Sequence, residues 1–230
     1  MKTLGLLGGM SWESTTSYYQ HLNRGTRDRL GGDHSAKLLI WSVDFATIVQ
    51  MQATGNWDGA TAVLVDAARR LEVAGAEALV ICANTMHRMA QEVQAAVNIP
   101  LLHVADSTAA SLIAAGVRRP LLLATKYTME QAFYRDRLSE KGVEALIPSS
   151  PERDRLHGII FEELIHGRFE PASRSEIAAI AQRATDENSA DGVILGCTEF
   201  ALLMHPCDFS VPLFDTTAIH ASAALDFALG

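Results

Sequence analysis

Short apolar runs alternate with longer amphipathic stretches along the whole chain. The apolar runs cover residues 3–7, 36–43, 78–81 and 99–104, then 120–124, 142–147, 192–195 and 212–214. Runs of this length bounded by Gly, Pro or polar residues are typical of buried strands. Strands that alternate with helices favour parallel sheets with right-handed crossovers. The pattern therefore predicts an α/β fold.

The stretches between the runs predict the helices. Apolar residues recur at helical spacing over residues 61–74, 156–165, 173–185 and 218–229, and a shorter helix is expected after Asn84-Thr85. Residues 47–57 contain Gln50 and Gln52 and are predicted to be a polar connector.

The second half of the chain repeats the first. Residues 76–85 align with residues 190–199 without a gap, and residues 4–8 resemble residues 121–125. A repeat of this length indicates two copies of one structural unit.

The repeat predicts two pseudo-symmetric lobes, each with a parallel sheet flanked by helices. No low-complexity linker separates them. We predict an N-terminal lobe from residues 1–105 plus 215–230 and a C-terminal lobe from residues 106–214. The active site is expected in a cleft between the lobes.

Composition narrows the class of protein. With 230 residues, 48% of them hydrophobic and 20% charged, the chain can bury a sizeable core. A net charge of −8 without a basic stripe argues against nucleic acid or an anionic membrane as partner. Three cysteines without close pairing favour a reducing compartment. No secretory segment or membrane-length run is evident, so a cytoplasmic location is expected.

The clearest chemical signal follows the strand at residues 192–195. Cys197, Thr198 and Glu199 come directly after it, and the strand ends of open α/β sheets are where reactive groups gather. A lone free cysteine is more often a buried apolar residue. The repeat favours a functional site, because it places Asn84 in the matching turn. Amide donors there are expected to lower the Cys197 pKa towards neutrality.

Three motifs occur in order along nearly the whole chain: Leu-Gly-Leu-Leu-Gly-Gly-Met at residues 4–10, Cys-Ala-Asn-Thr-Met-His at 82–87 and Gly-Cys-Thr-Glu at 196–199. Together they resemble the aspartate/glutamate racemase superfamily, most closely its cofactor-independent bacterial aspartate/glutamate and broad-specificity amino-acid racemases. The resemblance implies two flavodoxin-like lobes, a homodimer and a small amino-acid substrate. It also implies racemisation by cysteines that move a proton on both faces of the α-carbon, without pyridoxal phosphate.

The resemblance also implies which residues bind substrate. Backbone amides and the pairs Asn84-Thr85 and Thr198-Glu199 are expected to hold the substrate carboxylate. Further candidates are Met10, Gln52, Thr125 and Lys126. Lys126 is a candidate to attract a side-chain carboxylate. No metal site is expected, because Cys197, His205 and Cys207 lack zinc-ligand spacing.

The first-lobe motif departs from the family pattern. Family members usually carry cysteine immediately before Asn-Thr, where this chain has Ala83. Cys82 lies one position early, and on an extended strand it faces the opposite way. Three explanations are open: Cys82 is a substitute that reaches the substrate through a bulge, the enzyme has one true acid/base, or Ala83 is an introduced substitution.

These explanations leave alternative functions open. Cys197 alone would exchange the α-proton with retention, or protonate a carbanion as the one-cysteine decarboxylases of the superfamily do. Water or His87 would stand in for the missing partner, although His87 is expected to be a hydrogen-bonding residue rather than a base. The competing class is an inactive relative that binds a dicarboxylate. Nucleotide binding is not favoured, because the glycines of residues 5–9 lack the dinucleotide spacing.

Overall fold

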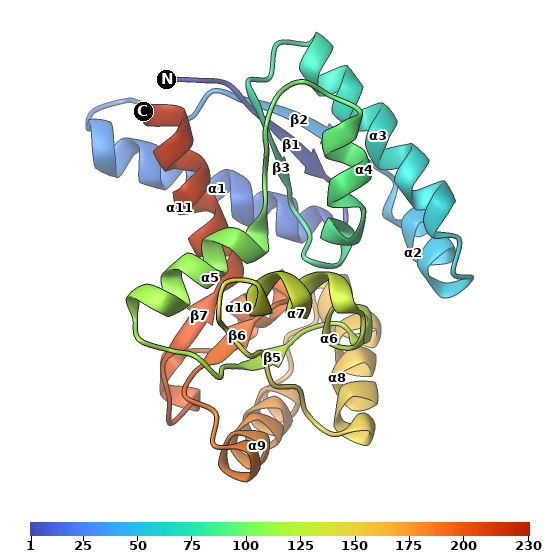
Figure 1. The fold of residues 1–230 in the computed structure, drawn as a ribbon, viewed down its shortest axis with the longest axis vertical. Helices are drawn as coiled ribbons and strands as arrows, with labels where there is room; N and C mark the ends of the chain where they lie inside the picture. The colour runs from blue at the N-terminus through green and yellow to red at the C-terminus, as the bar shows by residue number, and fades with distance from the viewer. The chain divides into compact units, whose positions relative to one another are not determined.

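The computed structural model describes residues 1–230, and the chain forms two compact units (Figure 1). Unit 1 comprises Met1–His103 and His220–Gly230, and unit 2 comprises Val104–Ile219. The sequence-based boundaries lie at residues 105/106 and 214/215. Each unit is a parallel sheet flanked by helices, so the predicted α/β class is confirmed.

Unit 1 contains a four-stranded parallel sheet in the order β2-β1-β3-β4. Its strands are β1 (Leu4–Gly8), β2 (Leu38–Ser42), β3 (Ala78–Ile81) and β4 (Leu101–Leu102). Its helices are α1 (Trp12–Leu30), α2 (Phe45–Ala53), α3 (Trp57–Val73), the 3-10 helix η1 (Thr85–Met89), α4 (Ala90–Ala95) and most of α11 (Thr216–Leu229). Leu7 lies opposite Ile81, so β1 and β3 end at the same edge.

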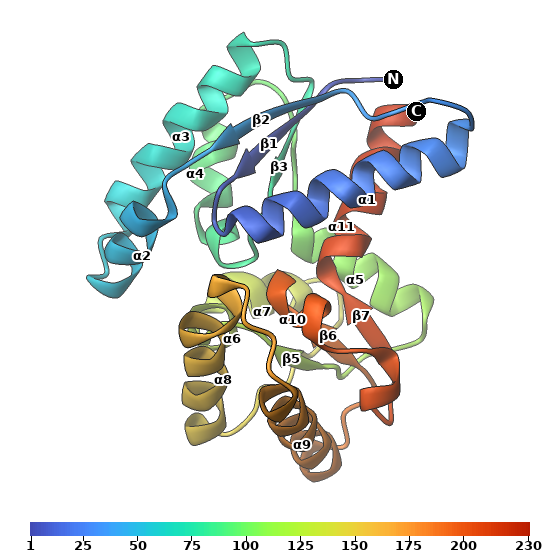
Figure 2. The ribbon, with the colours of Figure 1, turned by 180° about the vertical axis from the view of Figure 1, so that it is seen from behind.

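Side-chain alternation along the strands gives this sheet two apolar faces. Leu6 and Val80 pack with α1 and α11, which cover one face (Figure 2). Leu7, Leu79 and Ile81 pack with α3 and α4 on the other. Burial on both faces explains why the central strands read as continuous apolar runs.

Unit 2 contains a three-stranded parallel sheet in the order β5-β6-β7. Its strands are β5 (Leu121–Leu123), β6 (Val193–Leu195) and β7 (Leu213–Asp215). Its helices are α5 (Val104–Ala114), α6 (Lys126–Glu130), α7 (Ala132–Ser139), α8 (Ser150–Glu162), η2 (Leu164–His166), α9 (Pro171–Asn188), α10 (Thr198–Leu203) and η3 (Pro206–Asp208). One apolar cluster joins the sheet to the surrounding helices.

Backbone hydrogen bonds repeat between the two units. In unit 1 the N–H of Cys82 donates to the carbonyl of Leu7 at 2.9 Å. In unit 2 the N–H of Gly196 donates to the carbonyl of Leu123 at 2.7 Å. These bonds continue the β1–β3 and β5–β6 ladders, so Cys82 and Gly196 occupy equivalent positions, as the repeat predicts.

The prediction of a polar connector at residues 47–57 is wrong. Helix α2 occupies most of it, because the Asp44 carboxylate accepts the N–H of Ala46 at 3.3 Å and caps the first turn. Ile48 and Gln52, one helical turn apart, are buried on its inner side.

The prediction of a strand at residues 142–147 is also wrong. Only Leu146 forms a bridge, to Leu121 of β5. It lies on the edge of β5 away from β6, which is the place that β2 takes beside β1 in unit 1. Pro148 follows and has no N–H to extend a ladder. The helices of this unit are longer than predicted, since α8 begins at a Ser149 capping box and α9 continues to Asn188.

None of the helices is long and apolar enough to span a membrane.

The turn after β1 gives a test of the fold. Gly9 has φ of +88°, and a Cβ added there would lie 2.3 Å from the carbonyl oxygen of Val43. We expect Gly9→Ala to lower the unfolding free energy by about 3 kcal/mol or more, through strain and overlap together. The matched control is Gly167→Ala, at φ of +70° with open space around it, for which roughly 1–2 kcal/mol is expected. Urea unfolding of both variants measures the difference, and equal losses would contradict the close approach at Gly9.

Candidate functional site

The candidate residues of unit 1 gather at the edge where β1 and β3 end. Met10 follows β1, is 6% exposed and packs in one apolar cluster with Ala83 and Met86. Asn84 and Thr85 follow β3 and are also buried. The structure thus brings the first two sequence motifs together at one edge of the sheet.

Cys82 and Ala83 face opposite sides of unit 1. The Cys82 side chain belongs to the cluster beneath α1, with Leu6 and Tyr18, and is fully buried. Burial raises the pKa of its thiol well above the usual range. Ala83 belongs to the opposite cluster. The bond from Cys82 N–H to Leu7 O keeps the strand regular at this point, without the bulge that would turn the thiol around.

Gln52 reaches this edge from α2. Its side-chain amide lies 3.2 Å from the sulfur of Met86, the residue that follows the Asn84-Thr85 pair. The amide is buried, with 7% of the residue exposed. A residue predicted on a loop is therefore held on a helix beside the turn after β3.

A buried histidine cluster underlies the same edge, and the sequence did not single out two of its members. His87 packs against His103, with ring centroids 4.6 Å apart, and against His220, at 5.5 Å. The Tyr18 hydroxyl lies 2.8 Å from Nδ1 of His220, and Nε2 of that ring lies 2.8 Å from the carbonyl oxygen of Leu102. His103 lies near the end of the strand predicted at residues 99–104, and His220 lies on a predicted apolar helix. The sequence gives no other signal for either residue.

Burial sets the charge of this cluster. It lowers the pKa of His220 to about 4. Burial and then the nearby His103 and His220 hold the pKa of His87 well below 6.5. Both rings are therefore neutral near pH 7. Since a carbonyl only accepts, Nε2 of His220 carries the proton, and the Tyr18 hydroxyl donates to Nδ1.

The candidate residues of unit 2 lie at the matching edge, where β5 and β6 end. Cys197 is the N-cap of α10 and is 6% exposed. Its thiol donates to the Glu199 carboxylate at 3.0 Å. The residue before it, Gly196, must lack a side chain, because an added Cβ would lie 2.8 Å from Leu122 and 3.0 Å from Ala124. Close packing of β6 on β5 thus places the thiol at the strand end.

The Cys197 pKa differs from the sequence-based expectation. Burial raises it well above 9, and the Glu199 carboxylate raises it further by charge and by hydrogen bonding. The N–H groups of Glu199 and Phe200 at the start of α10 lower it, but they do not outweigh burial. The thiol is therefore protonated near pH 7, and the prediction of a depressed pKa is wrong.

The other unit 2 candidates adjoin Cys197 or the end of β5. Thr198 is the first residue of α10 and is 3% exposed. Thr125 caps α6, its hydroxyl accepting the N–H of Thr128 at 3.3 Å. The Lys126 ammonium pairs with the Asp154 carboxylate on α8, so its charge is compensated within unit 2.

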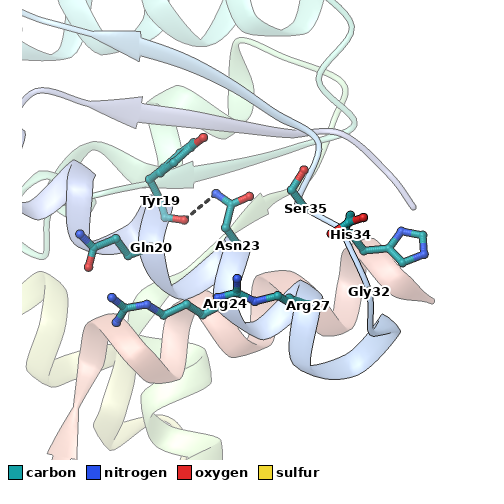
Figure 3. Close-up of a pocket in the computed structure, with 9 residues that line it drawn as sticks. Tyr19, Gln20, Asn23, Arg24, Arg27, Gly32, His34 and Ser35 are labelled. Atoms are coloured by element: carbon teal, nitrogen blue, oxygen red, sulfur yellow. Dashed lines mark hydrogen bonds between the residues drawn. The ribbon is translucent and has the colours of Figure 1, made fainter.

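A separate hollow of about 370 Å³ lies against the outer side of α1 (Figure 3). It is lined by Tyr19, Gln20, Asn23, Arg24, Arg27, Gly32, Asp33, His34 and Ser35. None of the candidate residues lines it, so it is distinct from both strand-end clusters.

Thiol labelling tests the Cys197–Glu199 contact. Removing the carboxylate charge in Glu199→Gln should lower the Cys197 pKa. Each pKa unit by which it falls gives about ten times more thiolate at a pH below the pKa. We expect iodoacetamide to modify Cys197 slowly at pH 7.5 in the wild type and at least severalfold faster in the variant. Peptide mass spectrometry follows all three cysteines, with exposed Cys207 as the reference and buried Cys82 unmodified. An unchanged Cys197 rate would show that Glu199 does not control the thiol.

The cluster also predicts a loss of stability in acid. His220 has a pKa near 4 when folded and about 6.5 when unfolded, so the unfolded state binds more protons between these values. The neutral His220 ring therefore contributes about 3 kcal/mol to the free energy of unfolding above pH 6.5. This contribution is lost as the pH falls from 6.5 to 4. We expect His220→Gln to lose less stability than the wild type between pH 7 and pH 4 in urea titrations. Parallel losses in the two proteins would contradict a buried neutral ring.

Comparison with known proteins agrees with the arrangement of these motifs. A profile described as Asp/Glu/Hydantoin racemase matches residues 7–224. The broad specificity amino-acid racemase RacX of Bacillus subtilis is 23% identical over 227 residues, 96% of each chain. Two crystal structures are similar over 100% of this chain and 100% of their own chains. One is a provisionally assigned Asp/Glu racemase from Yersinia pestis, with 49% identity and a TM-score of 0.91. The other is an aspartate racemase homologue from Pyrococcus horikoshii, with 36% identity and a TM-score of 0.87. The chain therefore belongs to the Asp/Glu/hydantoin racemase family.

Proposed function

We propose that this protein is an isomerase-family enzyme that moves the α-proton of an acidic amino acid, aspartate or glutamate, with its own side chains as acid and base. The observation that carries the proposal is the Cys197 thiol, held at the end of β6 and hydrogen-bonded to Glu199. Family membership and the names of the relatives support the reaction class and the choice of substrate.

The contacts of Cys197 suggest the order of proton transfers. The thiol proton first passes to Glu199, whose oxygen lies 3.0 Å away, because the thiolate is the basic form of cysteine. The thiolate then takes the α-proton, so the substrate C–H bond breaks and an S–H bond forms. Return of a proton to the same face restores the substrate with its configuration retained. The negative charge that develops in between needs donors fixed around the substrate carboxylate.

Inversion requires a second acid on the other face of the α-carbon, and Ala83 occupies the position equivalent to Cys197. A methyl group carries no transferable proton. Cys82 faces the cluster beneath α1, and its raised pKa opposes ionisation. We therefore propose that Cys197, with Glu199 as its proton acceptor, acts on one face of the α-carbon only. The protein, as its sequence stands, then exchanges the α-proton of one enantiomer much faster than it inverts it.

The substrate carboxylate is proposed to bind at Asn84-Thr85 and Thr198, with Met10, Gln52 and Thr125 as further contacts. Lys126 contributes less than the sequence suggested, since Asp154 already pairs with it. The homodimer and the cytoplasmic location stay predictions from the family resemblance and the composition.

The test is α-proton exchange followed by NMR in deuterated water, with each enantiomer of aspartate and glutamate in turn. We expect one enantiomer to exchange with retention in the wild type. Cys197→Ala should slow this at least about 100-fold, because a positioned acid or base contributes that much or more. Ala83→Cys should restore inversion by supplying the missing donor, and Ala83→Thr serves as a weaker donor.

The matched control is Cys82→Ala, which removes a thiol from the core and should leave exchange unchanged. Fast, balanced inversion of both enantiomers by the wild type, abolished by Cys82→Ala, would refute the proposal and show that Cys82 supplies the second proton.

A second candidate is an inactive relative that binds a dicarboxylate, and Ala83 is the observation that favours it. The same spectra distinguish the two functions. Exchange that is absent for all four amino acids, together with protection of Cys197 from alkylation by aspartate, would select the binding protein.

A further inference from the structure

One residue, His87, holds two successive carbonyl groups of the turn after β3. Its backbone N–H donates to the carbonyl of Asn84 at 3.1 Å. Its ring Nδ1 lies 3.0 Å from the carbonyl oxygen of Ala83. Because a carbonyl oxygen only accepts, Nδ1 carries the proton and donates.

The hydrogen bonds of this turn divide between the backbone and the ring of His87. Residues Thr85–Met89 form a 3-10 helix, in which backbone N–H groups bond three residues back rather than four. The N–H of His87 is therefore used by Asn84, where an α-helix would direct it to Ala83. The His87 ring donates to the Ala83 carbonyl instead. A buried carbonyl left without a donor would cost about 1–3 kcal/mol, and the turn would shift to avoid that cost.

The equivalent turn in unit 2 is built differently. There the carbonyl of Cys197, before α10, accepts the backbone N–H of Phe200, three residues further on, at 3.1 Å. The repeat pairs Phe200 with Met86, whereas in unit 1 it is the ring of His87 that bonds the Ala83 carbonyl. Extending the repeat by two positions pairs His87 with Ala201, whose side chain has no donor. The side-chain hydrogen bond is thus a feature of the turn at Ala83 and not of the shared fold.

The surroundings of His87 fix its ring. The residue is 2% exposed, and the rings of His103 and His220 pack against it. His220 is held in turn by Tyr18 and by the carbonyl of Leu102. A neutral, buried ring whose Nδ1 proton is given to the backbone is poorly suited to deliver a proton to substrate.

We propose that His87 is a positioning residue: its ring holds the Ala83 carbonyl, and with it the Asn84-Thr85 turn, in the conformation that receives the substrate carboxylate. The inference rests on the proposed function. His87 thereby acts through the turn and contacts neither the substrate nor its α-proton.

Two substitutions separate this role from that of an acid. Asn in His87→Asn keeps an N–H donor near the place of Nδ1, whereas His87→Leu keeps apolar bulk and removes the donor. Because small misplacements at a reacting centre cost on the order of 100-fold, we expect His87→Leu to lower kcat/KM for α-proton exchange by about that factor, with a raised KM. His87→Asn should stay within about 10-fold of the wild type. Thr26→Val, which removes a buried hydroxyl on α1 far along the chain from the turn, is the control for lost stability.

A second measurement does not depend on substrate. Amide hydrogen exchange at residues 84–87 should be faster in His87→Leu than in the wild type, with His87→Asn close to the wild type and Thr26→Val unchanged. If His87→Asn is as inactive as His87→Leu while its turn keeps wild-type protection, His87 is an acid or base and the proposal is overturned. Wild-type kinetics in His87→Leu would overturn it as well.

Failure of the proposed function gives a different result. If the wild type exchanges no α-proton of any of the four amino acids, the proposed reaction is wrong. The hydrogen-exchange comparison then still decides whether His87 holds the turn, and equal protection in His87→Leu and the wild type would overturn that claim on its own.

Discussion

The direction in which the side chains at both strand ends point depends on one backbone hydrogen bond in each unit. The N–H of Cys82 donates to the carbonyl of Leu7, and the N–H of Gly196 donates to the carbonyl of Leu123. These bonds fix the register at the ends of β3 and β6. Because successive side chains of an extended strand point to opposite faces, this register decides on which face of the sheet each side chain lies. It turns the Cys82 thiol beneath α1 and gives the next position to Ala83.

The same burial that positions Cys197 also suppresses its ionisation. A thiol with 6% exposure beside a carboxylate is stable as the protonated form, and the N-terminal amides of α10 offset this only in part. In the proposed reaction a partner must therefore take the thiol proton. Glu199 is near enough to do so, and this makes the Cys197–Glu199 pair, rather than the thiol alone, the unit of the proposed reaction.

The two turns show how two copies of one fold differ at the same strand end. In unit 2 the backbone N–H of Phe200, three residues further on, bonds the carbonyl of Cys197 at the strand end. In unit 1 the ring of His87 bonds the corresponding carbonyl of Ala83, and the rings of His103 and His220 pack against it. Tyr18 in turn holds His220. The copy with alanine at the strand end thus has a side chain as well as the backbone supporting the neighbouring turn.

The sequence by itself determined the α/β class, the repeat, the strand cores and the positions of Cys197 and Asn84, because these follow from local apolar runs and from the motifs that end them. It failed at residues 47–57, where the glutamines suggested a connector while Ile48 and Gln52 were buried one turn apart on a helix. Only the tertiary structure decided the charge state of Cys197 and the grouping of His87, His103 and His220. Burial, which distant segments create, is the largest cause of the raised Cys197 pKa, and Glu199 adds to it from two residues away. Contact between segments far apart in the chain brings the three histidines together.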